Sequence, residues 1–172
     1  VTQTINEIES ETEQTLETTT TAEQENAVID RSETFALLND MKAGWNLGNT
    51  LDAHSSADLT SETSWGNPKT TPEMIQAIAQ EGFHTLRIPV TWSKHVSAGP
   101  EYKIDAAWMD RVEEVVKYAL DCDMYVILDT HHEPDYWLKP QSDGLDEVQN
   151  ELCAIWQQIA ERFADYDEHL LF

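Results

Sequence analysis

Two adjacent histidines lie in a polar segment that directly follows an apolar run, and the side chains of this segment could do chemistry. The segment extends from Asp129 to Trp137 and holds His131, His132, Glu133 and Asp135. A metal site would combine imidazole with carboxylate ligands, although zinc ligands are usually spaced more widely and no second cluster completes the set. Neighbouring residues after a strand point to different sides, so the imidazoles need not share a role. Hydrogen bonding to a polyol substrate is the interpretation that the spacing favours over a metal.

Arg87 is a charged residue inside an otherwise apolar run. It lies between Leu86 and Ile88. A buried guanidinium is costly unless it is paired, so we expect it to have a partner. That partner is either the acid of a structural ion pair or a catalytic carboxylate that Arg87 orients and keeps ionised. Position alone does not separate the two.

The chain has six tryptophans, whose flat faces either pack in a core or stack on the apolar faces of sugars. Trp108 and Trp156 lie on apolar helical faces, which predicts core positions. The other four lie in or beside predicted strand-end loops: Trp45, Trp65, Trp92 and Trp137. Packing is the default role for any one of them, and four together favour at least one contact with a ligand.

Apolar patterns predict four strands that alternate with helices. The strands are expected at 43–49, 84–90, 124–129 and 169–172. The first and third are short apolar runs of the kind that forms buried strands. Helices are expected at 32–40, from Thr70 or Thr71 to Gly82, from Asp105 to about 119, and at about 145–165.

Parallel strands joined by helical crossovers fit two architectures, an open doubly wound sheet and a (β/α)8 barrel. No glycine-rich phosphate loop follows any predicted strand, which argues against a nucleotide-binding doubly wound sheet. Polar and aromatic residues do follow the strands, and chemistry at the carboxyl ends of strands is typical of the barrel. The sequence therefore predicts an α/β fold of the (β/α)8 type.

The composition is that of a globular protein with a strong acidic excess. Hydrophobic residues make up 40% and charged residues 25% of the 172 residues, and the formal net charge is −23. Nucleic acids and anionic membrane surfaces are bound through clustered Lys and Arg, so neither is expected as a partner. No apolar run approaches the roughly 20 residues of a membrane span.

Residues 1–27 are expected to form a disordered linker or tail. They contain seven Glu and eight Thr, and no Lys, Arg, Gly, Pro or aromatic residue. Such a segment cannot bury enough apolar surface to offset the entropy of ordering it. A Thr-rich linker ahead of a folded domain fits a multi-modular extracellular protein.

Two cysteines, Cys122 and Cys153, are too few for a disulfide framework and lack the spacing of metal ligands. We expect two buried thiols, with a single bridge between them as the alternative.

Four motifs together resemble the first half of a glycoside hydrolase family 5 catalytic domain, of the bacterial endo-β-1,4-glucanase type. They are GWNLGNTLDA (44–53), WGNP (65–68), GFHTLRIPVTW (82–92) and YVILDTHHE (125–133). The resemblance covers about Met41 to Phe172. It implies a (β/α)8 barrel, of which this chain supplies about four strands and three helices, and retaining hydrolysis of β-linked glucans by two glutamates.

The resemblance also implies roles for single residues. Arg87 would orient the nucleophile, and His131 would line the subsite where cleavage occurs. The residues on the non-reducing side of the cleft would be Asn49, Asn46, His54, Trp65 and His132. Neither a metal nor an organic cofactor is implied.

The acid/base glutamate of the family lies between Asn and Pro after strand four, and the nucleophile follows strand seven. No Asn-Glu-Pro occurs in this chain, and Glu133 follows strand three. Residues 28–172 are therefore expected to form the N-terminal half of a catalytic barrel, without either catalytic glutamate. Such a half is expected to be unstable or self-associating alone, and to act with a complementary C-terminal half. The alternatives are a non-catalytic glucan-binding or scaffold fragment, and a metal-dependent hydrolase centred on His131, His132 and Asp129.

Overall fold

The computed structural model describes residues 31–139 and 144–172. The chain divides into two units between Glu33 and Thr34. The expected disordered tail, 1–27, lies outside the described residues, as does the start of the expected domain at 28–30. The second unit contains the sheet and the candidate site.

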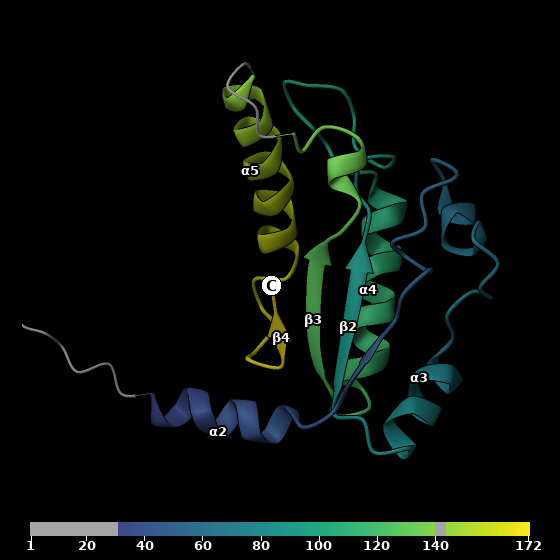
Figure 1. The fold of residues 1–172 in the computed structure, drawn as a ribbon, viewed down its shortest axis with the longest axis vertical. Helices are drawn as coiled ribbons and strands as arrows, with labels where there is room; N and C mark the ends of the chain where they lie inside the picture. The colour runs from purple at the N-terminus through teal and green to yellow at the C-terminus, as the bar shows by residue number, and fades with distance from the viewer. Residues whose placement is uncertain (1–30, 140–143) are drawn as a thin grey trace, which may run out of the picture. The chain divides into compact units, whose positions relative to one another are not determined.

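Four parallel strands form one sheet in the order in which they occur in the sequence (Figure 1). They are β1 (Gly44–Asn46), β2 (Thr85–Val90), β3 (Tyr125–Thr130) and β4 (Leu170–Leu171). A doubly wound sheet reverses its strand order at a switch point, whereas a barrel keeps the strands in sequence. The sheet therefore confirms the prediction that this chain supplies four strands of a (β/α)8 fold.

Helices precede the sheet and connect its strands, and two of them, α3 and α4, start at predicted caps. They are α2 (Ser32–Met41), α3 (Pro72–Gln80), α4 (Ala106–Leu120) and α5 (Leu145–Arg162). The side chain of Thr71 accepts a hydrogen bond from the backbone of Met74, and that of Asp105 from the backbone of Trp108. Gly82 follows α3 with φ +90°, a left-handed conformation that ends a helix and favours glycine.

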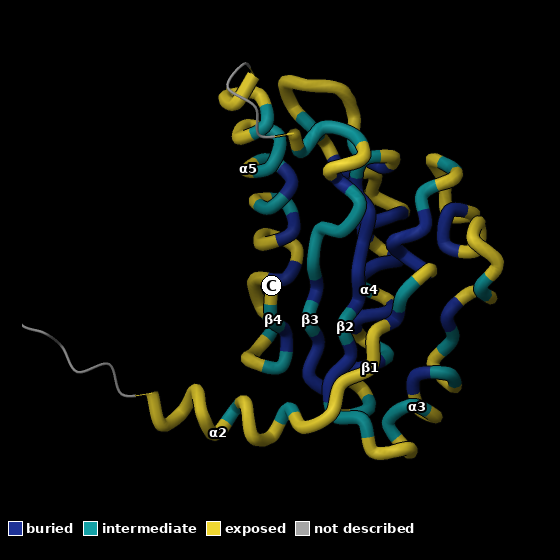
Figure 2. Tube along the Cα trace, in the orientation of Figure 1, coloured by how far each residue is buried: buried dark blue, intermediate teal, exposed yellow. Residues whose placement is uncertain are grey.

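The core lies between the inner strands and the helices that cover them (Figure 2). The predicted stripe of α4 is buried along its whole length, and so are most side chains of β2. Trp108 is fully buried, as predicted. Trp92 lies just after the end of β2, as predicted, and is fully buried, so it has the packing role that is the default for a tryptophan. Its backbone N–H is bonded to the carboxylate of Glu133, which holds the start of the loop after β2 inside the core.

The first strand and the first helix are more exposed than predicted. All three residues of β1 are exposed, because β1 pairs only with β2 and its other edge is open. The expected buried strand over 43–49 is therefore a short edge strand. Helix α2 has no buried residue, and Phe35 and Leu38 on its expected apolar side are 61% and 55% exposed.

Both cysteines are free thiols, so the bridge is excluded. Cys122 is partly buried, and burial raises its pKa. Cys153 is exposed on α5, so the expectation of two buried thiols is wrong for this residue. Its position is not on the stripe of α5 that contains the buried Ile155 and Ile159.

Within the described residues, no helix has both the length and the apolar character that crossing a membrane requires.

Candidate functional site

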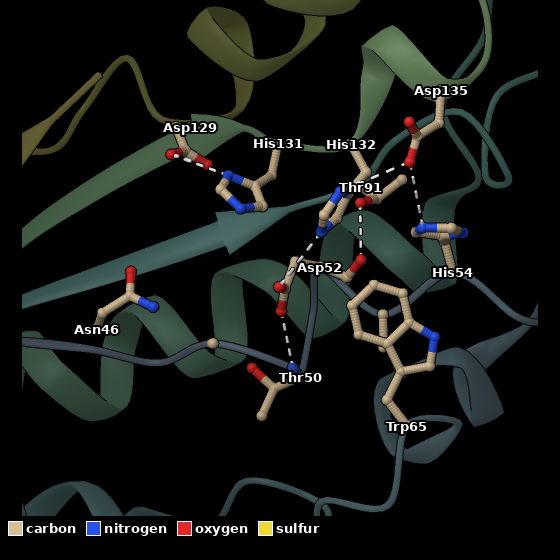
Figure 3. A network of polar contacts seen from close by, with 12 residues as sticks. Asn46, Thr50, Asp52, His54, Trp65, Thr91, Asp129, His131, His132 and Asp135 are labelled. Atoms are coloured by element: carbon tan, nitrogen blue, oxygen red, sulfur yellow. Dashed lines mark hydrogen bonds and ion pairs between the residues drawn. The ribbon is translucent and has the colours of Figure 1, made fainter.

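The candidate site lies where β1, β2 and β3 end, and the strand register places its residues side by side. Asn46, the last residue of β1, is level with Arg87 of β2. Asp129 of β3 is level with Pro89 of β2, and His131 directly follows β3. Parallel strands bring their carboxyl ends to one edge of the sheet, so side chains more than 40 positions apart in the sequence meet there. Figure 3 shows Asn46, Asp129 and His131 of this group from close by.

Arg87 is the cationic centre of the first part of the site. One of its terminal nitrogens donates to Oδ1 of Asn46 at 2.6 Å, and the other donates to Oδ2 of Asp129. The second nitrogen also lies 3.2 Å from Nδ1 of His131. The expected partner of Arg87 is therefore Asp129, and the two form an ion pair. Arg87 is half-buried, with 38% of its side chain exposed, because it faces the open end of the sheet.

Asp129 presents one oxygen to Arg87 and keeps the other free. Its Oδ1 is buried and has no hydrogen-bond partner among the residues that the structure describes. A buried carboxylate oxygen without a donor is costly. This oxygen is therefore an acceptor that a hydroxyl group or another side chain could satisfy.

The second part of the site is an aromatic cluster formed by His54, Trp65 and His132. The ring centroids of His54 lie 4.8 Å from those of Trp65 and 5.1 Å from those of His132, and Trp65 lies 5.3 Å from His132. Trp65 is 39% exposed, and its indole N–H donates to the hydroxyl of Ser55 at 3.1 Å. An indole face beside two imidazoles is suited to a sugar ring, which has an apolar face and a rim of hydroxyl groups.

Two polar residues, Asp52 and Tyr136, lie next to the imidazoles of this cluster. Nε2 of His132 lies 3.7 Å from Oδ2 of the buried Asp52, whose Oδ1 accepts the backbone N–H of Thr50. Nδ1 of His54 lies 2.6 Å from the hydroxyl of Tyr136. Burial, with the nearby carboxylates of Asp135 and Glu133, raises the pKa of Tyr136, which keeps this hydroxyl protonated.

His131 and His132 face different partners, as the sequence predicts. His131 lies next to Arg87 and Asp129, and His132 lies next to Asp52 and His54. Their ring planes are 80° apart. The two histidines therefore serve the two separate parts of the site.

Glu133 has a structural role. It is fully buried and accepts hydrogen bonds from the backbone N–H of Trp92, from the hydroxyl of Ser93 and from the indole of Trp137. These bonds join the end of β2 to the loop after β3. Its carboxylate has no exposed face to offer a substrate, which agrees with leaving it out of the catalytic assignment.

A buried ion pair fixes the loop that contains His54 and Trp65. Arg111 of α4 donates from two nitrogens to the two carboxylate oxygens of Glu62, at 2.8 and 2.9 Å. Glu62 belongs to a short 3₁₀ helix, Leu59–Thr63, inside this loop, and it also accepts the backbone N–H of Thr70. The paired geometry anchors the loop to a helix of the core.

The structure brings together six of the seven predicted site residues, in two groups. Asn46, Arg87 and His131 form one, and His54, Trp65 and His132 form the other. The seventh, Asn49, is exposed in a left-handed conformation with φ 59°, and its side chain has no hydrogen bond to the described residues.

Sequence reasoning missed Asp52 and Tyr136. The available signal for Asp52 was its place between two apolar residues, Leu51 and Ala53, both fully buried. No comparable pattern marked Tyr136, which reaches His54 only through the fold.

Residues around His132 also meet the distance requirement of a metal site. Two sets of three ligand atoms lie within 4.8 Å of one another, and both contain His132. One set adds Asp52 and His131, and the other adds His54 and Asp135. The chain therefore has the residue types and spacing that the metal interpretation required, although neither of these sets includes Asp129 or Glu133.

Comparison with known proteins identifies what this arrangement is similar to. The family model described as Cellulase (glycosyl hydrolase family 5) matches residues 51–172. Endoglucanase A of Ruminococcus albus is 54% identical over 136 residues, which are 79% of this chain and 37% of that protein. Endoglucanase B of Clostridium cellulovorans is 51% identical over 79% of this chain and 30% of its own length.

Solved structures agree in sequence and in fold. A xyloglucan-specific endo-β-1,4-glucanase from a metagenomic library, in complex with cellotriose, superposes with a TM-score of 0.79 at 52% identity, over 82% of this chain and 42% of that one. A broad-specificity endoglucanase from Ruminococcus champanellensis with bound cellotriose gives 0.76 at 52% identity, over 78% and 40%. This chain thus spans about two fifths of the length of these structures. Its sequence and its fold place it in glycosyl hydrolase family 5.

Proposed function

We propose that this chain forms the glucan-binding part of an enzyme that hydrolyses internal β-1,4 bonds of plant cell-wall glucans by a retaining mechanism. The observation that carries the proposal is the arrangement at the ends of β1 to β3. There, Trp65 with its two imidazoles lies beside the group around Arg87. Two relatives that are 52% identical to this chain over the aligned residues were solved with cellotriose bound, which supports a glucan as the ligand.

Each part of the site would contribute differently. The exposed face of Trp65 would stack on a sugar ring, while His54 and His132 would bind its hydroxyl groups. Arg87 would supply a fixed positive charge that orients a catalytic carboxylate and keeps it ionised. His131, held by Arg87, would bind the sugar at the point of cleavage. Asn46 would help to fix the guanidinium, and Asn49 would reach the ligand from its exposed position.

We further propose that both catalytic glutamates lie outside these residues. Retaining hydrolysis needs two carboxyl groups about 5 Å apart, one on each side of the scissile bond. Asp129 is paired with Arg87, and Asp52 is buried and bonded to Thr50. Glu133 is saturated with donors inside the core. None of these carboxylates is free to act as a proton donor and then as a base.

The open edges of the sheet support a complementary C-terminal half as the partner. Strand β1 pairs only with β2, and β4 pairs only with β3, so one edge of each lacks main-chain partners within the described residues. Large apolar side chains near these edges are exposed, Trp45 at 45% and Phe172 at 58%. A second half of the barrel would pair both edges and cover this surface.

The second candidate is a non-catalytic glucan-binding fragment, for which the saturation of Glu133 is the specific observation. Either function would be performed outside the cell, where insoluble plant cell-wall glucan is found.

Native affinity electrophoresis tests the binding that both candidates share. The chain is run in gels that contain hydroxyethyl cellulose, xyloglucan or the α-linked glucan dextran. We expect retardation by the β-linked polymers and none by dextran. Equal mobility in all three gels would contradict a β-glucan site on this chain.

A further inference from the structure

The ligand atoms of His54, His132 and Asp135 converge on one point beside the proposed sugar site. Nε2 of His54 lies 3.9 Å from Oδ2 of Asp135, and Nδ1 of His132 lies 3.8 Å from the same oxygen. The three atoms lie within 4.8 Å of one another. They come from two segments that the fold brings together: His54 lies in the loop after β1, and His132 and Asp135 lie at the start and the end of the 3₁₀ turn Glu133–Asp135 that follows β3.

These distances are close to those of a transition-metal site. A tetrahedral zinc ion with bonds of about 2.1 Å separates its ligand atoms by about 3.4 Å. The distances from the two imidazoles to Asp135 exceed this value by roughly half an ångström. Asp135 can move by that amount, because 63% of its side chain is exposed. The two imidazole nitrogens lie within 4.8 Å of each other, so binding an ion would also draw the rings together. Two imidazoles and one carboxylate leave the fourth position of a tetrahedral ion for a water molecule or a further ligand.

Each imidazole has a polar group near the nitrogen that would not bind the metal, within hydrogen-bond distance for His54 and slightly beyond it for His132. The nitrogen of His132 that faces away from Asp135 lies 3.7 Å from the buried carboxylate of Asp52. The corresponding nitrogen of His54 lies 2.6 Å from the hydroxyl of Tyr136. A carboxylate or hydroxyl in this place fixes the ring orientation and the tautomer, and raises the basicity of the metal-binding nitrogen. Histidine and aspartate side chains that meet by chance on a protein surface lack such outer partners.

The other possible set, Asp52 with His131 and His132, is less suited to a cation. Arg87 lies 3.2 Å from Nδ1 of His131, so a fixed positive charge stands beside that set. Asp52 is buried and already accepts the N–H of Thr50.

We propose that His54, His132 and Asp135 bind a divalent transition-metal ion such as Zn²⁺ at the mouth of the glucan site. A bound ion occupies the two imidazole nitrogens that would otherwise face the sugar, so metal and glucan compete. The predicted competition depends on the proposed glucan function of this site. The proposed metal binding does not depend on it.

Isothermal titration of the tag-free chain with ZnSO₄ tests the metal site. We expect one ion per chain, and affinities weakened at least tenfold by Asp135→Asn and by His132→Gln. Asp135→Asn is the decisive variant, because an exposed carboxylate can be changed without disturbing the core. Asp167→Asn and His169→Gln, an exposed aspartate and a half-buried histidine elsewhere in the chain, are the matched controls and should bind as the native chain does. A native chain that does not bind Zn²⁺, or Asp135→Asn with native affinity, would overturn the site.

The alternative set and the ligand identity are tested separately. His131→Gln should retain zinc binding. If His131→Gln lost zinc binding while Asp135→Asn kept it, the ion would be assigned to the set of Asp52, His131 and His132. The electron paramagnetic resonance spectrum of the Cu²⁺-loaded chain should show splitting from two imidazole nitrogens, reduced to one in His132→Gln.

Titration with cellotetraose tests the competition. Saturating Zn²⁺ should weaken cellotetraose binding to the native chain and leave binding to Asp135→Asn unchanged. Equal affinity with and without zinc in the native chain would refute the competition. Absence of cellotetraose binding in zinc-free buffer would instead count against the proposed glucan site and leave the metal site standing.

Discussion

Among single residues, Trp65 is the one whose loss should affect glucan binding most simply. Its side chain is 39% exposed and packs beside the imidazoles of His54 and His132. Stacking on a sugar ring contributes on the order of 1 kcal/mol beyond area burial, so Trp65→Ala should weaken β-glucan binding roughly tenfold. Retardation in hydroxyethyl cellulose gels measures this change. Trp45→Ala, which removes a similarly exposed indole from β1, is the control and should leave the affinity as it was.

His95 makes the stability of the fold depend on pH. Its imidazole is buried and stacks on the indole of Trp108, with centroids 3.7 Å apart and planes 7° from parallel. Burial lowers the pKa of His95 from 6.5 to about 4, against the opposing effect of Asp105 and Asp58. Between pH 6.5 and 4, the unfolded chain therefore binds a proton that the folded chain does not. The stability that depends on neutral His95 is complete above this window and is lost as the pH falls through it.

His95→Phe should flatten this dependence, because phenylalanine retains the ring contact and does not titrate. As the pH falls from 7 to 4, the free energy of unfolding should decrease in both proteins. We expect the decrease to be larger in the native chain, by up to about 3 kcal/mol. Urea unfolding at matched protein concentration measures both. Glu113 also titrates with a shifted pKa. Burial disfavours its charged form, but hydrogen bonds from Tyr166 and Arg162 stabilise it and lower the pKa to about 2. This effect is the same in both proteins. Parallel pH profiles for the two proteins would show that His95 is not the cause.

At the level of elements, the loop between β1 and α3 depends on one buried ion pair. Arg111→Met leaves Glu62 as a buried charge without its cation. The loss of one partner from a buried ion pair typically lowers the free energy of unfolding by about 3–5 kcal/mol. Arg162→Met removes a partly exposed arginine that pairs with Asp110 and Glu113 between α5 and α4, and it should cost about 1 kcal/mol or less. Urea unfolding measures the two losses. Similar losses for the two variants would mean that the loop does not depend on Arg111.

The sequence predicted those elements whose signals are local. The cap at Asp105 and the apolar stripe that follows it define α4, and the continuous apolar run defines β3. The ion pair of Arg111 and Glu62 joins residues 49 positions apart, and no spacing rule links them. The same holds for Tyr136 and His54, which are 82 positions apart. The sequence also gave no sign that Glu133 accepts the backbone N–H of Trp92, since the two residues are 41 positions apart.

Considered as a whole molecule, the described part of the chain is an open sheet with two unpaired edges. Strands β1 and β4 each have one neighbour, and Phe172 and Trp45 are exposed beside them. Open edges and apolar surface favour association between chains. The net charge of −23 opposes it by repulsion that salt screens.

We therefore expect the chain alone to self-associate, more strongly as the salt concentration rises. Light scattering after size-exclusion chromatography should show a mass that increases with protein concentration. Addition of the complementary C-terminal part of Ruminococcus albus Endoglucanase A, a protein 54% identical to this chain over the matched residues, should give a 1:1 complex instead. A monomer at every concentration and salt level would contradict the proposed need for a second half.

The most direct test of the account is the release of reducing sugar from carboxymethyl cellulose and xyloglucan. The 172-residue chain is compared with the same chain fused to the C-terminal part of the Ruminococcus albus enzyme. The proposal predicts no release by the chain alone, release by the fusion, and loss of that release in the fusion with Arg87→Met. Sugar release by the chain alone would contradict the claim that both catalytic glutamates lie elsewhere, and would make Asp129, Glu133 and Asp135 the first residues to replace.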